Sequence, residues 1–197
     1  MTFILASKSA SRQKLLENAG LTFEALPAGI DEGVIKSEML KCGSSVLDIT
    51  ERLASEKALK ISKEHPDQYI LGGDQILTCN GQLFSKARTV SEAKEHLKFF
   101  KGKSHTLTTS IAIATNNKII WVYTSEPKLT MRDFSDEFLD DYMSNAGDAL
   151  LHSVGCYYLE GIGIQLFSEI KGDYYDILGL PLLPLMKKLR DLKLIND

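Results

Sequence analysis

The sequence has few cysteines, no long apolar run and no excess of charge of one sign. The three cysteines, Cys42, Cys79 and Cys156, are odd in number and widely separated, and no pair has the spacing of zinc ligands. This usage is typical of a reducing compartment and excludes a disulfide framework. No stretch approaches the ~20 apolar residues that span a bilayer, and the run Phe3–Ala6 is too short for a signal peptide. We therefore expect a cytoplasmic protein with no membrane partner.

The charge balance gives no reason to expect a nucleic-acid partner. The chain carries 23 basic and 26 acidic residues, for a formal net charge of −3. A polyanionic ligand would therefore need a local cluster of cations. The length of 197 residues indicates one domain, residues 1–197, in which two lobes around a central cleft would also fit.

Three common nucleotide-binding and hydrolase motifs are missing. The chain has no G-x-x-x-x-G-K-[ST] loop, no G-x-G-x-x-G turn and no H-E-x-x-H helix. The sequence Gly161-Ile162-Gly163 lacks both a third glycine and a preceding strand.

The apolar pattern predicts an α/β fold with a mixed sheet flanked by helices. A strict alternation of strands and helices is broken by one long hairpin, over residues 103–128, with a turn at Asn116-Asn117. Other expected strands are 3–6, 21–26 and 69–77, and 27–33 is expected to be a loop. The expected helices are 12–19, one from Ser44 or Ser45 to about 64, 91–100 with Ser91 as N-cap, 135–142 with Ser135 as N-cap, and 182 to about 194.

The first candidate constellation is a turn between a strand and a helix that contains Ser7, Ser9, Ser11 and Arg12. Hydroxyls, backbone N–H groups and a helix N-terminus all favour a bound anion. Serines before a helix are also common as N-caps, so the local pattern leaves both interpretations open.

The second constellation is Gly72-Gly73-Asp74-Gln75, an acid after two glycines in a strand. The glycines allow another group to approach the backbone closely, and a turn acid is the alternative interpretation. Further along the chain, local pattern alone favours an ordinary role. It predicts a solvated helix face for Glu56 and Lys57, a surface position for Lys86 and a structural role for His105.

Taken together and in order, these segments resemble the Maf family of nucleotide pyrophosphatases over nearly the whole chain. The matching segments are 5–9, 30–32, 54–58, 73–75, 85–86, 102–105, 161–163 and 172–181. The resemblance implies hydrolysis of a nucleoside triphosphate between its α and β phosphates. It also implies a divalent cation (Mg²⁺ or Mn²⁺), an elongated fold like that of inosine triphosphatases and, commonly, a homodimer.

The same resemblance assigns roles to individual residues. Asp74 is the expected proton acceptor for the attacking water, and Glu32 joins Asp74 as a metal ligand. The expected substrate ligands are Ser7, Ser9, Arg12, Lys57 and Lys86. These types suit the reaction, because phosphoryl transfer relies on positioning and charge neutralisation.

Base preference depends on positions where this chain departs from the family pattern. Ser11 stands where the family sorts substrates, Gln75 can pair with a base edge, and Glu160 suits a methylated, cationic guanine. The segments 73–75 and 160–164 resemble the 7-methyl-GTP branch more than the dTTP/UTP branch, and Ser11 leaves the base preference open. Two alternatives stay open: a non-catalytic nucleotide-binding regulator of septum formation and cell division, and an inosine-triphosphatase-type house-cleaning enzyme.

Overall fold

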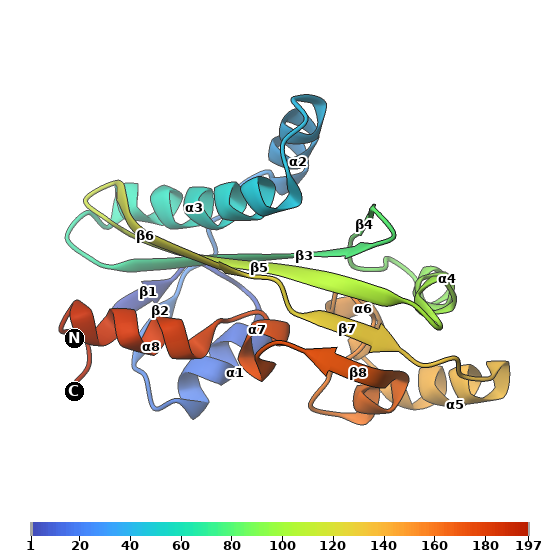
Figure 1. The fold of residues 1–197 in the computed structure, drawn as a ribbon. Coiled ribbons are helices and arrows are strands. Elements are labelled where there is room, and N and C mark those ends of the chain that lie inside the picture. The colour runs from blue at the N-terminus through green and yellow to red at the C-terminus, as the bar shows by residue number, and fades with distance from the viewer. Residues whose placement is uncertain (1, 197) are drawn as a thin grey trace. The chain divides into compact units, whose positions relative to one another are not determined.

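The expected α/β class is confirmed by a computed structural model that describes residues 2–196. Its mixed sheet has eight strands in the order β2-β1-β3-β5-β7-β8, with β4 paired to β3 and β6 paired to β5, and helices flank it (Figure 1). The chain divides into two compact units. The first contains Met1–Gln75, Thr108–Ser125 and Tyr174–Asp197, and the second contains Ile76–Leu107 and Glu126–Asp173.

The first unit is built around strand β1, which pairs in parallel with β2 and with β3. Because both faces of β1 are covered, all three of its residues are buried and apolar. The elements of this unit are β1 (Phe3–Leu5), α1 (Ala10–Asn18), β2 (Phe23–Ala25), α2 (Glu32–Lys41), α3 (Val46–Glu64), α7 (Tyr174–Ile177), α8 (Leu182–Asp191), β6 (Lys118–Ser125) and parts of β3 (Ile70–Cys79) and β5 (Ser104–Thr115).

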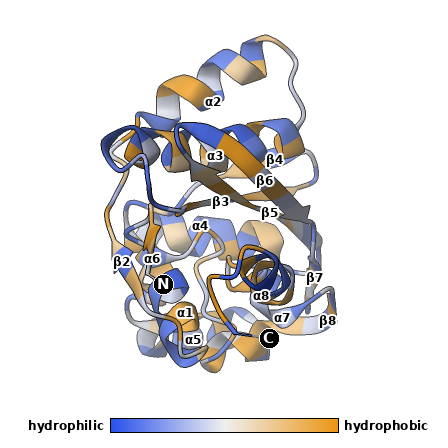
Figure 2. Cartoon of the chain, turned by 90° about the vertical axis from the view of Figure 1, so that its left-hand side faces the viewer, coloured by the Kyte–Doolittle hydropathy of each residue, from blue (hydrophilic) through white to orange (hydrophobic). Residues whose placement is uncertain are grey.

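Alternate residues of β1 belong to two apolar layers. Phe3 and Leu5 pack in one core cluster with residues of α1 and α8, such as Leu16 and Leu185. Ile4 belongs to a second cluster that includes Ala58 of α3. Figure 2 shows apolar and polar stretches on the same helices, as expected for elements with one face against a sheet. The core therefore fixes α3 on one side of β1 and α1 with α8 on the other.

The two glycines of β3 allow close packing, and the strand continues through them without a break. A Cβ on Gly72 would lie 2.1 Å from the carbonyl oxygen of Ala54, so α3 rests directly on the strand backbone. A Cβ on Gly73 would lie 3.2 Å from Nε of Arg12. The expectation that these glycines admit neighbouring groups is confirmed.

Local sequence signals correctly predict where two helices begin and where the hairpin turns. Helix α3 begins with a capping box between Ser45 and Asp48. The hairpin β5–β6 turns at Asn116 and Asn117, whose φ angles of 50° and 55° suit a tight hairpin turn. Ser135 caps α5 as expected.

Other boundaries differ from the prediction. The N-cap of α4 is Thr89 and not Ser91, because the Thr89 hydroxyl accepts from the backbone N–H of Glu92. Ser9 caps α1, so that helix begins at Ala10, two residues earlier than expected. The loop expected over residues 27–33 ends in helix α2, whose N-cap is Asp31. No residue of α2 is fully buried, so the helix leaves no apolar periodicity in the sequence.

The second unit surrounds strand β7, which pairs antiparallel with β5 and with β8. The elements of this unit are β4 (Gln82–Phe84), α4 (Val90–Phe100), β7 (Lys128–Met131), α5 (Asp136–Ala146), α6 (Ala149–His152), a 3-10 helix (Ile162–Leu166), β8 (Phe167–Lys171) and the other parts of β3 and β5. None of the helices described in residues 2–196 has the length and apolar character needed to cross a membrane.

His105 is a buried member of the core of the second unit. Its Nε2 lies 2.8 Å from the hydroxyl oxygen of Tyr157, and its ring lies near those of Phe100 and Phe167. Burial lowers the pKa of His105 from 6.5 to about 4. These contacts agree with the structural role expected for this residue.

We predict that His105 makes the protein less stable in acid. Between pH 6.5 and about 4 the unfolded chain binds a proton at this site that the folded chain does not bind. The free energy of unfolding should therefore decrease as the pH is lowered through that window, by up to about 3 kcal/mol. Replacement by His105→Gln, which keeps a hydrogen-bonding side chain without a titration, should remove that part of the slope. Urea unfolding of both proteins from pH 7.5 to 4.5 measures the difference; equal slopes would contradict the prediction.

Candidate active site

A buried ammonium group joins two carboxylates in the first unit. Nζ of Lys57 lies 2.8 Å from Oε1 of Glu32 and 2.7 Å from Oδ1 of Asp74. Only 11% of the Lys57 side chain is exposed, so the solvated-face interpretation is wrong for this lysine. The neighbouring Glu56 instead pairs with Arg52 on the helix surface.

Three separate elements supply this triad. Glu32 is the first residue of α2, Lys57 lies in α3 and Asp74 lies in β3. The close packing of α3 on Gly72 brings Lys57 to the strand, and its ammonium group also donates to the carbonyl oxygen of Gly73 at 3.4 Å. The position of Lys57 therefore depends on Gly72, which lies two residues before Asp74 in the chain.

The electrostatics of the triad favour the charged form of Glu32. Partial burial works to raise the pKa of Glu32, but the ammonium of Lys57, with help from Lys36 and Arg12, holds that pKa below its ordinary value. The second carboxylate oxygen of Asp74, Oδ2, is buried and has no hydrogen-bond partner within residues 2–196. A buried carboxylate oxygen in this state has lone pairs available for a water or a cation.

Arg12 adds a second cation beside the triad. Its Nε donates to the carbonyl oxygen of Gly179 at 2.7 Å, and its Nη1 donates to Oγ of Ser7 at 3.3 Å. Burial lowers the pKa of Arg12, and the nearby carboxylates of Asp74 and Glu32 act in the opposite direction. The guanidinium group therefore interacts electrostatically with the same acids that Lys57 contacts.

The serines of the first turn have structural partners. Oγ of Ser9 accepts from the backbone N–H of Arg12, as an N-cap does. Oγ of Ser7 accepts from the backbone N–H of Ser9 as well as from Arg12. Ser11 is the second residue of α1 and is half-buried. The turn thus organises Arg12, and its role in phosphate binding stays a prediction.

Gln75 is held by backbone carbonyls. Its Nε2 donates to Oγ1 of Thr109 at 2.8 Å and to the carbonyl oxygens of Ile177 and Asp176 at 3.1 and 3.2 Å. These three acceptors share the two hydrogens of the amide nitrogen, so a contact of Gln75 with a base would use its carbonyl oxygen Oε1, and its role in base recognition stays a prediction. Sequence reasoning assigned no role to Thr109, Asp176 or Gly179, although Gly179 lies in a segment that resembles the family.

Not every predicted residue belongs to this cluster. The first unit brings together Glu32, Lys57, Asp74 and Arg12, with Ser7, Ser9 and Gln75 around them. Lys86 and Glu160 are exposed residues of the second unit. Their roles in substrate binding stay predictions.

A divalent cation fits the donors in the first unit. Glu32 and Asp74 offer oxygen ligands, and Oδ2 of Asp74 is buried and unpartnered in the described chain. The described residues contain no group of three or more His, Cys, Asp or Glu side chains able to hold a metal. Two carboxylates suit Mg²⁺, which keeps several waters and takes further oxygens from phosphates.

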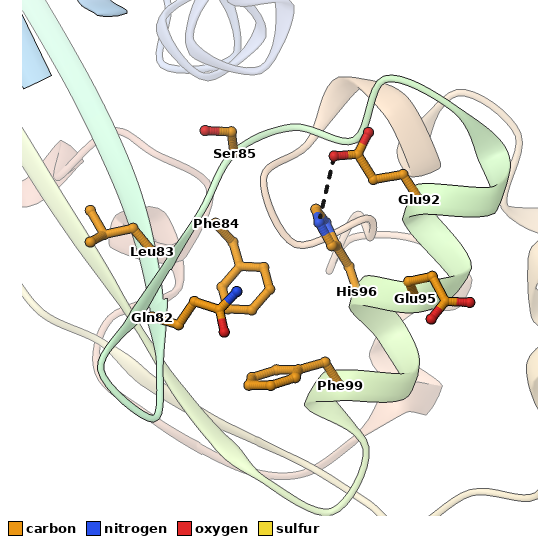
Figure 3. Close-up of a pocket in the computed structure, with 8 residues that line it drawn as sticks. All are labelled: Gln82, Leu83, Phe84, Ser85, Glu92, Glu95, His96 and Phe99. Carbon is orange, nitrogen blue, oxygen red and sulfur yellow. Dashed lines mark ion pairs between the residues drawn. The ribbon is translucent and has the colours of Figure 1, made fainter. Parts of the chain in front are cut away.

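The second unit contains a pocket of about 370 Å³ between β4 and α4 (Figure 3). Phe84 and Phe99 contact each other there with ring centroids 5.1 Å apart, and His96 lies near Glu92. The lining residues are Gln82, Leu83, Phe84, Ser85, Glu92, Glu95, His96 and Phe99. This lining contains two glutamates and no lysine or arginine, so it would repel a polyanion such as a triphosphate.

We predict that Lys57→Met raises the pKa of Glu32. The ammonium group is the main attraction that lowers this pKa, so its loss leaves the effect of burial opposed only by the weaker attractions of Lys36 and Arg12. A carboxyl-detected NMR titration of glutamate measures the shift. Lys60→Met is the matched control on the same helix, because Lys60 contacts Glu64 in an exposed pair. An unchanged Glu32 titration in Lys57→Met would show that the contact does not exist in solution.

Comparison with known proteins gives a family. A protein-family model with the description "Maf-like protein" matches residues 2–192 of this chain. A protein of Granulibacter bethesdensis named nucleoside triphosphate pyrophosphatase is 46% identical over 190 residues, which cover 96% of each chain. A protein of Rhizobium meliloti named 7-methyl-GTP pyrophosphatase is 42% identical over 193 residues, which cover 98% of this chain and 97% of that protein. A solved structure of a nucleoside-triphosphatase / dITP/XTP pyrophosphatase from Mycobacterium abscessus aligns over 98% of both chains, at 14% identity and a TM-score of 0.43, a likeness too weak to carry an argument. The chain belongs to the family of Maf-like proteins.

Proposed function

We propose that this protein hydrolyses the α–β phosphoanhydride bond of a nucleoside triphosphate and releases a nucleoside monophosphate and pyrophosphate. The observation that carries the proposal is the ammonium of Lys57 between the carboxylates of Glu32 and Asp74, with Arg12 beside them. Two cations and two acids at one place, where Arg12 and Asp74 are buried and Glu32 is partly exposed, suit a triphosphate and its metal. The names printed for relatives at 46% and 42% identity support the same reaction.

Asp74 is the proposed proton acceptor. Its Oδ1 is occupied by Lys57, and its Oδ2 is buried without a partner in residues 2–196, which leaves that oxygen for a water. In the proposed step the water oxygen bonds to the α-phosphorus and Asp74 takes the proton of the water. The P–O bond between the α and β phosphates breaks, and pyrophosphate leaves. Lys57 and Arg12 bind phosphate oxygens and offset the negative charge of the transition state.

Glu32 and Asp74 would hold the divalent cation, Mg²⁺ or Mn²⁺. Such a cation neutralises phosphate charge and orients the oxygens of the substrate. Lys57 must then share its two carboxylates with the metal. This competition is acceptable, because the incoming phosphates supply new acceptors for the ammonium group.

The finer substrate proposal is 7-methyl-GTP. It is supported by the printed names of relatives such as the one from Rhizobium meliloti. Glu160 is the proposed partner of the cationic methylated base, Ser11 is a proposed specificity residue, and Lys86 is a proposed phosphate ligand. Gln75 is a further proposed specificity residue; its amide nitrogen is held by three acceptors, so it would contact a base through its carbonyl oxygen Oε1.

The alternative of a non-catalytic regulator of cell division is less favoured. The relatives carry the names of enzymes, and a binding module has no need of a buried acid with an unpartnered oxygen. The homodimer, the cytoplasmic location and a central cleft between two lobes stay predictions.

We predict that the purified protein with Mg²⁺ or Mn²⁺ releases pyrophosphate from at least one nucleoside triphosphate. The panel should contain 7-methyl-GTP, GTP, dTTP, UTP and ITP, with pyrophosphate and orthophosphate measured separately. Orthophosphate as the first product would show that a different bond is cleaved. A preference for ITP over all the others would favour the house-cleaning alternative over the 7-methyl-GTP branch.

We also predict that Asp74→Asn lowers kcat by about 100-fold or more, because it removes the proton acceptor and keeps the size of the side chain. Asp67→Asn is the control, since Asp67 is an exposed acid of the same unit. Circular dichroism checks that both variants are folded. If Asp74→Asn turned over substrate at the original rate, Asp74 would have no part in the reaction.

A further inference from the structure

The short helix α7 ends on carbonyl groups that need partners. At a helix C-terminus, the last carbonyl oxygens have no N–H donor inside the helix. Here the amide of Gln75 donates to two of them, on Asp176 and Ile177. Because every neighbour of this nitrogen is an acceptor, the orientation of the amide is well defined. A side chain of β3 thus caps α7.

Thr109 of β5 completes this cap. Its hydroxyl accepts from Nε2 of Gln75 at 2.8 Å and donates to the carbonyl oxygen of Asp176 at 3.0 Å. The same carbonyl accepts from the backbone N–H of Gly179 at 3.1 Å. Thr109 is fully buried, and its bond to the carbonyl oxygen of Asp176 is formed away from water. Three donors on one carbonyl fix the turn over residues 176–179 against the sheet.

This turn delivers one carbonyl to Arg12. Gly179 has a φ of 92°, a conformation that residues other than glycine rarely adopt. Its carbonyl oxygen accepts from Nε of Arg12 at 2.7 Å, while Oγ of Ser7 accepts from Nη1. An arginine has five N–H donors, and these two bonds fix the plane of the guanidinium group. The remaining donors are the ones an anion can use.

We propose that Gln75 and Thr109 are positioning residues, which hold the 176–179 turn so that Gly179 aims the guanidinium of Arg12 at the triphosphate. The inference rests on the proposed function, in which Arg12 binds phosphate. It assigns to the amide nitrogen of Gln75 a role in orienting a phosphate ligand, beside the proposed role of this residue in base recognition. Ordering Arg12 before the substrate arrives removes a loss of side-chain entropy from the binding step.

The first test compares two variants of one residue. Thr109→Val keeps the size of the side chain and loses both hydrogen bonds, so it should lower kcat/KM by about 10-fold or more, as small misplacements do. Thr109→Ser keeps the hydroxyl and should restore most of the activity. Ser110→Ala is the control, because it removes a buried hydroxyl of the same strand that contacts Thr124 and not the 176–179 turn. Equal losses in Thr109→Val and Ser110→Ala would overturn the proposal.

The second test asks whether Thr109 acts through Arg12. In an Arg12→Ala background, Thr109→Val should cause no further loss of kcat/KM, because there is no guanidinium left to position. A full additional loss would show that Thr109 acts independently and would overturn the proposal. Gln75→Met, at a half-buried position, serves as a second variant in the same cycle if Thr109→Val folds poorly.

The third test does not depend on activity. The N–H group at Nε of Arg12 should exchange slowly with water in the original protein and give an NMR signal that disappears in Arg12→Ala. Thr109→Val and Gln75→Met should speed this exchange, and Thr109→Ser and Ser110→Ala should not. Unchanged exchange in both positioning variants would overturn the inference. If the protein released no pyrophosphate from any substrate, the proposed function would fail and this measurement would still decide the positioning role.

Discussion

The contact on which the candidate site depends is the ammonium of Lys57 between two carboxylates. Without that cation, Glu32 and Asp74 would repel each other, and the buried Asp74 would lose its direct ionic partner and keep only Arg12 as a nearby cation. Removing one partner of a buried ion pair typically costs about 3 to 5 kcal/mol, a large share of the stability of an ordinary domain. Two local features of the chain place helix α3 so that Lys57 reaches these carboxylates. A glycine at position 72 admits helix α3, and a capping box fixes where that helix begins.

The cations near Asp74 differ in how firmly they are held. The two short contacts of Lys57 are with carboxylates, which a metal and a phosphate could replace in part, and its contact with the carbonyl oxygen of Gly73 is longer, at 3.4 Å. Arg12 is bound at Nε to a backbone carbonyl that no ligand displaces. We infer a division of work in which Lys57 changes partners during the reaction and Arg12 stays in place. The flexible, point-like ammonium and the planar guanidinium are suited to these different tasks.

Much of the fold could be predicted from the sequence because its signals are local. The buried strand β1, the N-caps at Ser45 and Ser135 and the turn at Asn116-Asn117 each depend on a few adjacent residues. Helix α2 was missed because it buries no residue fully and so shows no apolar period. Ser91 was predicted as an N-cap from its residue type alone, and the backbone geometry gives that position to Thr89.

The candidate site was less predictable, since its contacts join distant segments. Lys57 carries the pattern of an exposed helix lysine, and its burial follows from the glycine at position 72, which the local sequence does not connect to it. The resemblance to the Maf family named Lys57 and Asp74, but no spacing rule could supply their contact. Thr109 gave no signal at all, because a threonine in an alternating strand is ordinary.

The bond from Arg12 to Gly179 joins residues 167 positions apart in the chain. The first unit is likewise assembled from three separate segments, the last of which begins at Tyr174. During synthesis on the ribosome, an unfinished chain can form β1, α1 and α3 and still lack the carbonyl that holds Arg12. The nascent protein therefore cannot organise this arginine until translation has passed residue 179, and a chain released early would carry an incomplete site.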